Sequence, residues 1–164
     1  MLERARPRSV SDLSTLSTNH CGVAIAASRG ARLTAINTGN RKRSFEHICA
    51  RVTSRSSSCS VLLIYRPGSR TVDASSFFTE LSDLLDRLMT LSDPIMIVGD
   101  LNIRMDRPDD PLHELLATYN LSCRVSSPTH DHGGLLDVVL TRNDAPLTPA
   151  VDIIDPGLSH HHLP

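Results

Sequence analysis

The sequence predicts an α/β sandwich, a two-sheet fold in which strands alternate with two helices. The chain of 164 residues is long enough for one domain with a core. Apolar residues make up 40% of the chain and charged residues 21%, which excludes a disordered or fibrous protein. Apolar runs of strand length alternate with two segments of helical period, and none approaches the ~20 residues of a membrane helix.

The chain is expected to begin loosely and to continue into short strands. Residues 1–20 are polar, rich in Ser, Thr and Arg, and lack a regular apolar period. We therefore expect a loose lead-in there and a partial domain over residues 21–164. Gly22–Ala27 and Arg32–Asn37 have the composition of two short strands, and residues 28–30 have that of the turn between them.

Two stronger strands are predicted next. Glu46–Thr53 alternates, with Ile48, Ala50 and Val52 on one side, which indicates a half-buried strand. After a polar turn, Ser60–Tyr65 is almost continuously apolar, which is typical of a strand buried on both faces.

Two segments have the period of a helix. Large apolar residues recur every three or four positions across Ala74–Leu91, and Asp73, Ser75 or Ser76 can cap its start. Leu112–Tyr119 is a shorter segment of the same kind.

Four more strands complete the prediction. Ile95–Val98 is wholly apolar, which predicts a buried strand that ends at the glycine turn after it. The other three are separated by turn-rich stretches and lie at Ser122–Val125, Leu135–Thr141 and Ala150–Ile154.

The net charge of −1 conceals a strong asymmetry. Residues 1–70 carry 12 Lys and Arg against 3 Asp and Glu, a net charge of +9. Residues 71–164 carry 5 against 15, a net charge of −10. This division indicates either a basic face for a polyanion with an acidic cluster for a cation, or two halves that attract each other across one fold.

The sequence has no pattern of secretion or of a zinc site. No apolar stretch follows the arginines of residues 1–10, so we expect no signal peptide and an intracellular protein. The cysteines, which have neither CxxC nor zinc-ligand spacing, are interpreted as structural: Cys21, Cys49, Cys59 and Cys123.

The clearest candidate site follows the strand Ile95–Val98 and reads Gly99-Asp100-Leu101-Asn102. An acid and an amide two residues apart, at the C-terminal edge of a buried strand, can project into one cleft. A carboxylate in that place suits Mg²⁺, which takes oxygen ligands, or a general base that acts on water. The alternative is a plain turn with an Asx cap.

Two later features also carry reactive side chains. Asp137 interrupts an otherwise apolar strand, so it either pairs with a partner such as a histidine or faces solvent. Leu158–His162 contains three histidines, which can bind metal, stabilise phosphate or transfer protons; a solvated tail or tag remnant is the alternative. His130 is a further candidate because it lies in the loop that leads into Asp137.

The motifs occur in a specific order: Tyr65-Arg66-Pro67, a helix, GDLN, PTHDHGG with LLDVVL, and last SHHHL. In this order they resemble the endonuclease/exonuclease/phosphatase superfamily. More narrowly, they are similar to the apurinic-endonuclease-like nuclease domain of non-long-terminal-repeat retrotransposons. The resemblance covers about residues 21–164 and implies the two-sheet α/β sandwich of that superfamily.

The resemblance implies a catalytic role for each matching residue. Tyr65 would help to hold the scissile phosphate. Asp100 would activate or orient the attacking water, and Asn102 would position it. Asp137 would buttress the histidine that stabilises the phosphoryl transition state, which aligns with His161. The implied reaction is divalent-metal-dependent hydrolysis of a phosphodiester, mostly in DNA.

The implied metal is Mg²⁺ or Mn²⁺, and the implied ligands are Asp100, Asn102 and His160. His160 stands where the family has an acid. No strand with a matching metal-binding Glu precedes Gly22, and the chain stops at Pro164, before the closing strand of the family. We therefore expect a domain that is incomplete at both ends, with reduced affinity for metal.

Three functions follow from these observations. The first is a metal-dependent DNA endonuclease of the retroelement type, with DNA as its partner, no membrane association and no inferable protein partner; a DNA substrate would imply the nucleus. The second is an inactive nuclease remnant that binds nucleic acid non-specifically through the arginines between residues 29 and 70. The third is a small-molecule phosphoesterase. Arg41-Lys42-Arg43 is also compatible with a merely solvated loop.

Overall fold

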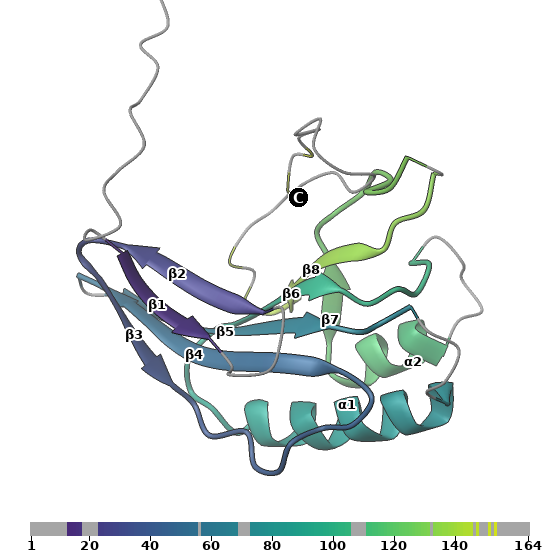
Figure 1. The fold of residues 1–164 in the computed structure, drawn as a ribbon, viewed down its shortest axis with the longest axis horizontal. Coiled ribbons are helices and arrows are strands. Elements are labelled where there is room, and N and C mark those ends of the chain that lie inside the picture. The colour runs from purple at the N-terminus through teal and green to yellow at the C-terminus, as the bar shows by residue number, and fades with distance from the viewer. Residues whose placement is uncertain are drawn as a thin grey trace, which may run out of the picture.

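The computed structural model describes residues 13–17, 23–55, 57–68, 73–105, 111–131, 133–145, 147, 151 and 153. Within these residues the chain forms eight strands and two helices (Figure 1). In chain order they are β1 (Leu13–Ser17), β2 (Ala24–Ser28), β3 (Ala31–Ala35), β4 (Glu46–Ser54), β5 (Ser57–Tyr65), α1 (Ala74–Leu88), β6 (Ile95–Asp100), α2 (Pro111–Thr118), β7 (Leu121–Cys123) and β8 (Asp137–Arg142).

The strands form two sheets. The larger is six-stranded, with the order β3-β4-β5-β6-β8-β7, and the smaller pairs β1 with β2. Only β5 and β6 are parallel among the described pairs, and α1 provides the crossover that a parallel pair requires. The other pairs are antiparallel.

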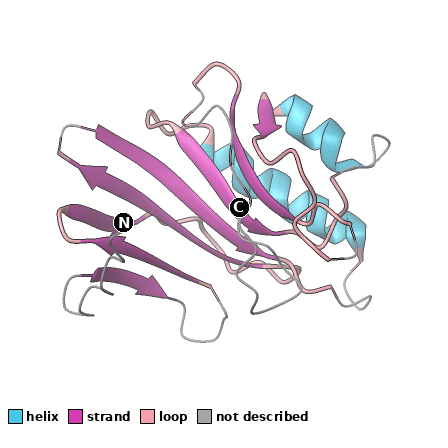
Figure 2. Ribbon diagram, turned by 90° about the horizontal axis from the view of Figure 1, so that it is seen from above, coloured by secondary structure: helices cyan, strands magenta, loops and turns pink. Residues whose placement is uncertain are grey.

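The molecule is layered around the larger sheet. Both helices lie against one face of it, and the β1–β2 sheet lies over the opposite face (Figure 1). The helices cover the half of the sheet where β5 and β6 end, whereas the opposite end, where β4 turns into β5, extends beyond them (Figure 2). One end of the sheet is therefore built on helices, and the other is not.

The main core lies between the helices and the larger sheet. The buried face of α1 consists of Phe77, Leu81, Leu84, Leu85 and Leu88. Its period of three and four residues is the one that the sequence shows, and these side chains form one buried cluster with Leu62, Ile64, Ile95 and Ile97 of β5 and β6. Alternate residues of β5 and β6 therefore point to the helices, and those between them point to the opposite face.

Most predicted elements are present within a few residues of their expected bounds, and the mixed α/β fold is confirmed. The strand β1 differs from the prediction, because it lies in the segment expected to be a loose lead-in. It pairs with β2 along its whole length, from Leu13 opposite Ser28 to Ser17 opposite Ala24. That pairing uses backbone groups, so the sequence of β1 needs no apolar period to form it.

The expected turn between two short strands is confirmed at Arg29 and Gly30. Because β2 pairs with β1 and β3 pairs with β4, this turn carries the chain from one sheet to the other. One other expectation is corrected. Val151 and Ile153, in the expected strand at residues 150–154, are not in a strand; both are partly buried against the core. The rest of that segment lies outside the described residues. In the part of the chain that the structure describes, no helix is long and apolar enough to cross a membrane.

Candidate active site

The predicted site residues that the structure describes come together at the end of the larger sheet that the helices cover. Tyr65 ends β5, Asp100 ends β6 and Asp137 begins β8, and the strand register places them side by side in one row. Glu46, at the start of β4, continues this row beside Tyr65. Residues that share a register position point to the same face, here the face away from the helices. Asp100, Asp137 and Glu46 are half-buried, and Tyr65 is 38% exposed.

A glycine allows β6 to approach β5 closely beside this row. Gly99 has a φ of 146°, and a Cβ atom on it would lie 1.7 Å from the carbonyl oxygen of Ile64. Only glycine fits that position, because every other residue would collide with the backbone of the neighbouring strand. The glycine of the GDLN motif is therefore required by the sheet itself.

Asn102 holds the carboxylate of Asp100 in a fixed orientation. Its backbone N–H donates to Asp100 Oδ1 at 2.8 Å, and its side-chain Nδ2 donates to Asp100 Oδ2 at 3.1 Å. Nδ2 also donates to the carbonyl oxygen of Arg66 at 2.7 Å, which ties this turn to the end of β5. Asn102 adopts the left-handed conformation with a φ of 48°, which asparagine tolerates better than most residues. The predicted Asx turn is thus present, and it also orients the acid.

Asp137 is positioned by a residue that the sequence does not single out. The hydroxyl oxygen of Thr129 accepts hydrogen bonds from the N–H groups of Leu136 at 3.1 Å and Asp137 at 3.0 Å. Thr129 is fully buried, and its own N–H donates to the carbonyl oxygen of Gly134 at 3.0 Å. The only signal for it is its place in the PTHDHGG motif. His130 also donates through its backbone to Gly134, at 3.1 Å, within the same turn.

The row offers oxygen ligands to a divalent cation. Asp100 and Asp137 occupy facing positions on neighbouring strands, and carboxylates are the ligands that Mg²⁺ prefers. The described residues contain no group of three or more His, Cys, Asp and Glu side chains close enough to hold a metal ion. His160 and His161 lie outside the described residues, so their predicted positions stay predictions. Two carboxylates with water and phosphate oxygens match the usual surroundings of Mg²⁺, so the donor chemistry fits.

The described cysteines are unsuited to act as nucleophiles. Burial raises the pKa of the Cys49 thiol to about 11. Burial also raises the pKa of Cys59 and that of Cys123. A thiol with a raised pKa carries little thiolate near neutral pH, which agrees with a structural role. Cys21 lies outside the described residues.

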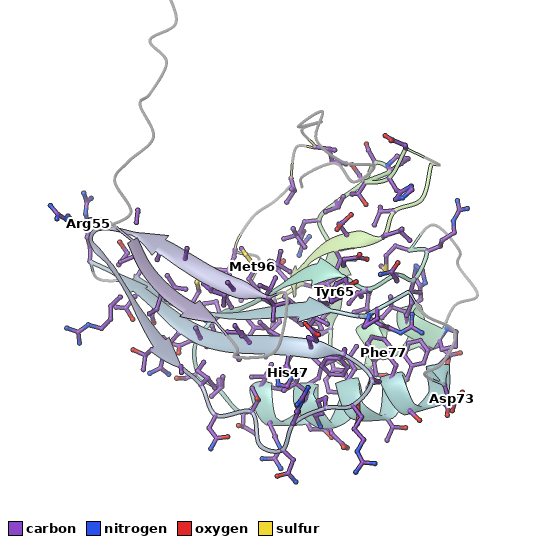
Figure 3. All side chains as sticks on the ribbon, in the orientation of Figure 1. His47, Arg55, Tyr65, Asp73, Phe77 and Met96 are labelled. Carbon is purple, nitrogen blue, oxygen red and sulfur yellow. The ribbon has the colours of Figure 1, made fainter. Side chains whose placement is uncertain are left out.

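The basic and acidic halves of the chain contact each other directly. Lys42 lies 3.8 Å from Asp83, and the Glu80 carboxylate accepts hydrogen bonds from the N–H groups of Arg43 and Ser44. The loop with Arg41, Lys42 and Arg43 is thereby held along α1, on the helix side of the sheet. Arg55 lies at the uncovered end of the sheet, away from Tyr65 (Figure 3). Part of the charge asymmetry is therefore attraction within the fold.

Comparisons with known proteins identify the family and the fold. Residues 2–159 match the sequence model of the Endonuclease/Exonuclease/phosphatase family. Three solved structures share the fold at low identity. The endonuclease domain of TRAS1, a telomere-specific non-LTR retrotransposon, is 15% identical with a TM-score of 0.58; the match covers 82% of this chain and 76% of that one.

The second is the 3′ phosphatase NExo from Neisseria bound to a product DNA hairpin, which is 18% identical with a TM-score of 0.63 and coverages of 93% and 77%. The third is the human Nocturnin catalytic domain, which is 13% identical with a TM-score of 0.60 and coverages of 82% and 62%. No curated protein sequence matches. Because the family match spans nearly the whole chain, this protein belongs to the endonuclease/exonuclease/phosphatase family.

Proposed function

We propose that this chain hydrolyses phosphodiester bonds of DNA with the help of a divalent metal ion, as a retroelement-type endonuclease domain. The observation that carries the proposal is the row of Tyr65, Asp100 and Asp137 at one end of the sheet, with Asn102 bound to both oxygens of Asp100. Family membership supports hydrolysis of phosphoester bonds. The similar fold of an endonuclease domain and of a phosphatase bound to DNA supports DNA as the substrate.

Asp100 is the group that we assign to the attacking water. Each of its carboxylate oxygens accepts one hydrogen bond from Asn102, so the direction of the carboxylate is fixed. A carboxylate held in this way would orient a water molecule and accept its proton without first having to reorganise.

The neighbouring residues have complementary roles. The hydroxyl of Tyr65, which is partly exposed in the same row, would donate to a phosphate oxygen. Asp137 would orient His161, which would stabilise negative charge at the phosphorus. Asp100 and Asp137 would hold Mg²⁺ or Mn²⁺, with Asn102 and His160 as the further implied ligands. When bound, the metal supplies charge neutralisation for the phosphate.

The decisive experiment is nicking of supercoiled plasmid by the full chain in Mg²⁺, in Mn²⁺ and in EDTA. Asp100→Asn keeps the shape of the side chain and removes its charge, so we expect at least a 10²-fold loss of cleavage. His161→Ala should lose activity to a similar extent. The matched control is Asp83→Asn, since Asp83 is an exposed carboxylate on α1 that lies 3.8 Å from Lys42, on the helix side of the sheet.

Each outcome separates the proposed functions. Metal-dependent nicking that Asp100→Asn abolishes and Asp83→Asn preserves would support the endonuclease. Nicking that survives Asp100→Asn would contradict it. A folded protein that binds DNA without cleaving it would be a nuclease remnant. Hydrolysis of a small phosphate ester, with no action on plasmid, would identify a small-molecule phosphoesterase.

A further inference from the structure

We propose that Arg66 is a positioning residue for the active site. It holds the turn at residues 100–102 from the helix side of the sheet. This inference rests on the proposed function. The catalytic roles assigned above involve the face of the sheet that carries Tyr65, Asp100 and Asp137. Arg66 follows Tyr65 directly and lies on the opposite side, against α1.

The backbone of Arg66 is bonded to the two ends of the turn. Its N–H donates to the carbonyl oxygen of Asp100 at 2.9 Å. Its carbonyl oxygen accepts from Asn102 Nδ2 at 2.7 Å, which is the same amide group that donates to the carboxylate of Asp100. Any shift of Arg66 is therefore transmitted to the acid through Asn102.

The side chain of Arg66 contacts the same turn from the helix side of the sheet. Its Nη1 lies 3.4 Å from the carbonyl oxygen of Leu101 and 3.4 Å from that of Asn102. These contacts are long for hydrogen bonds, so they act mainly by placing the guanidinium charge beside two carbonyl dipoles. Asn102 is in the left-handed conformation, and a cation beside its carbonyl and that of Leu101 stabilises this arrangement of the turn.

The aromatic ring of Phe77 holds the guanidinium group of Arg66 in place. The Arg66 Cζ atom lies 5.0 Å from the centre of the Phe77 ring, which is a cation–π contact. Phe77 is fully buried and packs edge-on against Phe45, and it lies on the α1 side of the sheet, near the end of β5 that carries Tyr65 (Figure 3). Arg66 Nε is buried, and no described acceptor is within hydrogen-bond distance of it. The guanidinium is thus clamped between α1 and the turn, on the side away from Tyr65.

The test compares Arg66→Met with a matched control. Methionine retains an apolar stem over Phe77 and removes every side-chain donor. Arg124→Met is the control, because Arg124 is also half-buried and also donates to the backbone, through Nη2 to the carbonyl of Arg142 at 3.2 Å, and through Nε to Thr141 Oγ1 at 2.7 Å. Arg66→Lys keeps a positive charge at this position but lacks the planar guanidinium group.

The expected result is a change in turnover without a change in DNA affinity. Arg66→Met should lower kcat about 10- to 100-fold and leave KM and Kd for DNA within about threefold, since small displacements of a catalytic group have effects of this size. Arg66→Lys should recover part of the loss. Arg124→Met should retain the wild-type kcat when rates are corrected for the folded fraction.

Three results would overturn the inference. The first is an equal loss of kcat in Arg66→Met and Arg124→Met, which would indicate a general structural role. The second is a weaker Kd with a salt slope reduced by about one, which would indicate direct contact with phosphate. The third applies if the wild-type protein does not cleave DNA. The proposed function then fails, and hydrogen exchange of the backbone amides tests the inference about Arg66. Unchanged exchange of the Asn102 amide in Arg66→Met would then overturn the inference, and faster exchange than in Arg124→Met would support it.

Discussion

At the scale of single residues, the site combines local spacing with contacts from distant segments. The two-residue spacing of Asp100 and Asn102 predicts that their side chains lie together, and the structure confirms it with two hydrogen bonds. Thr129 and Arg66 act on the same site from segments 8 and 36 residues away from their partners. Their roles could not be predicted, because a buried Thr and a stacked Arg have no local sequence pattern.

His47 makes the stability of the fold depend on pH. Burial lowers the pKa of His47, and Lys42 lowers it further, while Glu80 opposes the shift. The ring nitrogen Nε2 lies 2.8 Å from the hydroxyl of Thr38. The unfolded chain therefore binds a proton more readily at this residue, so the stability that it contributes is present above the ordinary pKa of 6.5 and is lost as the pH falls from there through the lowered pKa of the folded state.

We expect the free energy of unfolding to fall as the pH is lowered from about 7 through 6.5 toward the lowered pKa of the folded state, and His47→Gln to remove part of that slope. Urea denaturation at a series of pH values measures the free energy of unfolding and its dependence on pH. His113→Gln is the control, because His113 lies on α2, away from His47. An unchanged slope in His47→Gln, or an equal change in both variants, would show that this histidine is not the source.

At the scale of elements, strand positions are predictable and strand partners are not. The apolar runs at β5 and β6 and the period of α1 are local patterns, and the structure confirms them. The partners of β1, β2 and β3 depend on backbone hydrogen bonds that almost any sequence can form, so the sequence does not show that the turn between β2 and β3 joins two different sheets. The row of site residues depends on register, which is a property of the assembled sheet.

The close approach of β5 and β6 predicts a large effect of Gly99→Ala. A Cβ atom would lie 1.7 Å from the carbonyl oxygen of Ile64, so the strands must separate where the site is formed. We expect a loss of at least about 3 kcal/mol of stability, or failure to fold. Urea denaturation and soluble yield measure it.

Gly133→Ala is the matched control for this substitution. Gly133 also has a positive φ, 76°, but among the described residues, its chain neighbours aside, no atom lies within 4 Å of the position of its Cβ. Its replacement should cost only the backbone strain, about 1 kcal/mol. Equal losses in the two variants would show that backbone conformation, and not the contact with β5, explains the requirement for glycine.

At the scale of the whole molecule, part of the charge asymmetry serves attraction within the fold. Arg51 and Asp93, from opposite halves of the chain, form an ion pair, as do Lys42 and Asp83. The sequence leaves open whether the basic half serves a polyanion or the fold. The structure places part of it along α1, because the Glu80 carboxylate binds the backbone at Arg43 and Ser44. Hydrogen bonds from Ser44 and Arg43 outweigh the effect of burial and lower the pKa of Glu80.

This arrangement predicts that the basic loop takes no part in binding DNA. Arg41 and Arg43 lie on the helix side, whereas the row at Tyr65 and Asp100 lies on the other face. The double variant Arg41→Ala/Arg43→Ala should therefore keep the DNA affinity and its dependence on salt. Titration of labelled DNA at several salt concentrations measures both. A salt slope reduced by about one for each arginine would contradict the prediction.

The sequence by itself determined the fold class and the position of nearly every helix and strand, and it predicts Tyr65, Asp100, Asn102 and Asp137 as site residues. These are local properties, since apolar period, glycine turns and the spacing of acid and amide are read within a few residues. Only the tertiary structure decided which strands pair, that Gly99 must be glycine, and that Arg66 and Thr129 support the site. Those facts depend on contacts between backbone groups of different segments, and no local sequence pattern predicts such contacts.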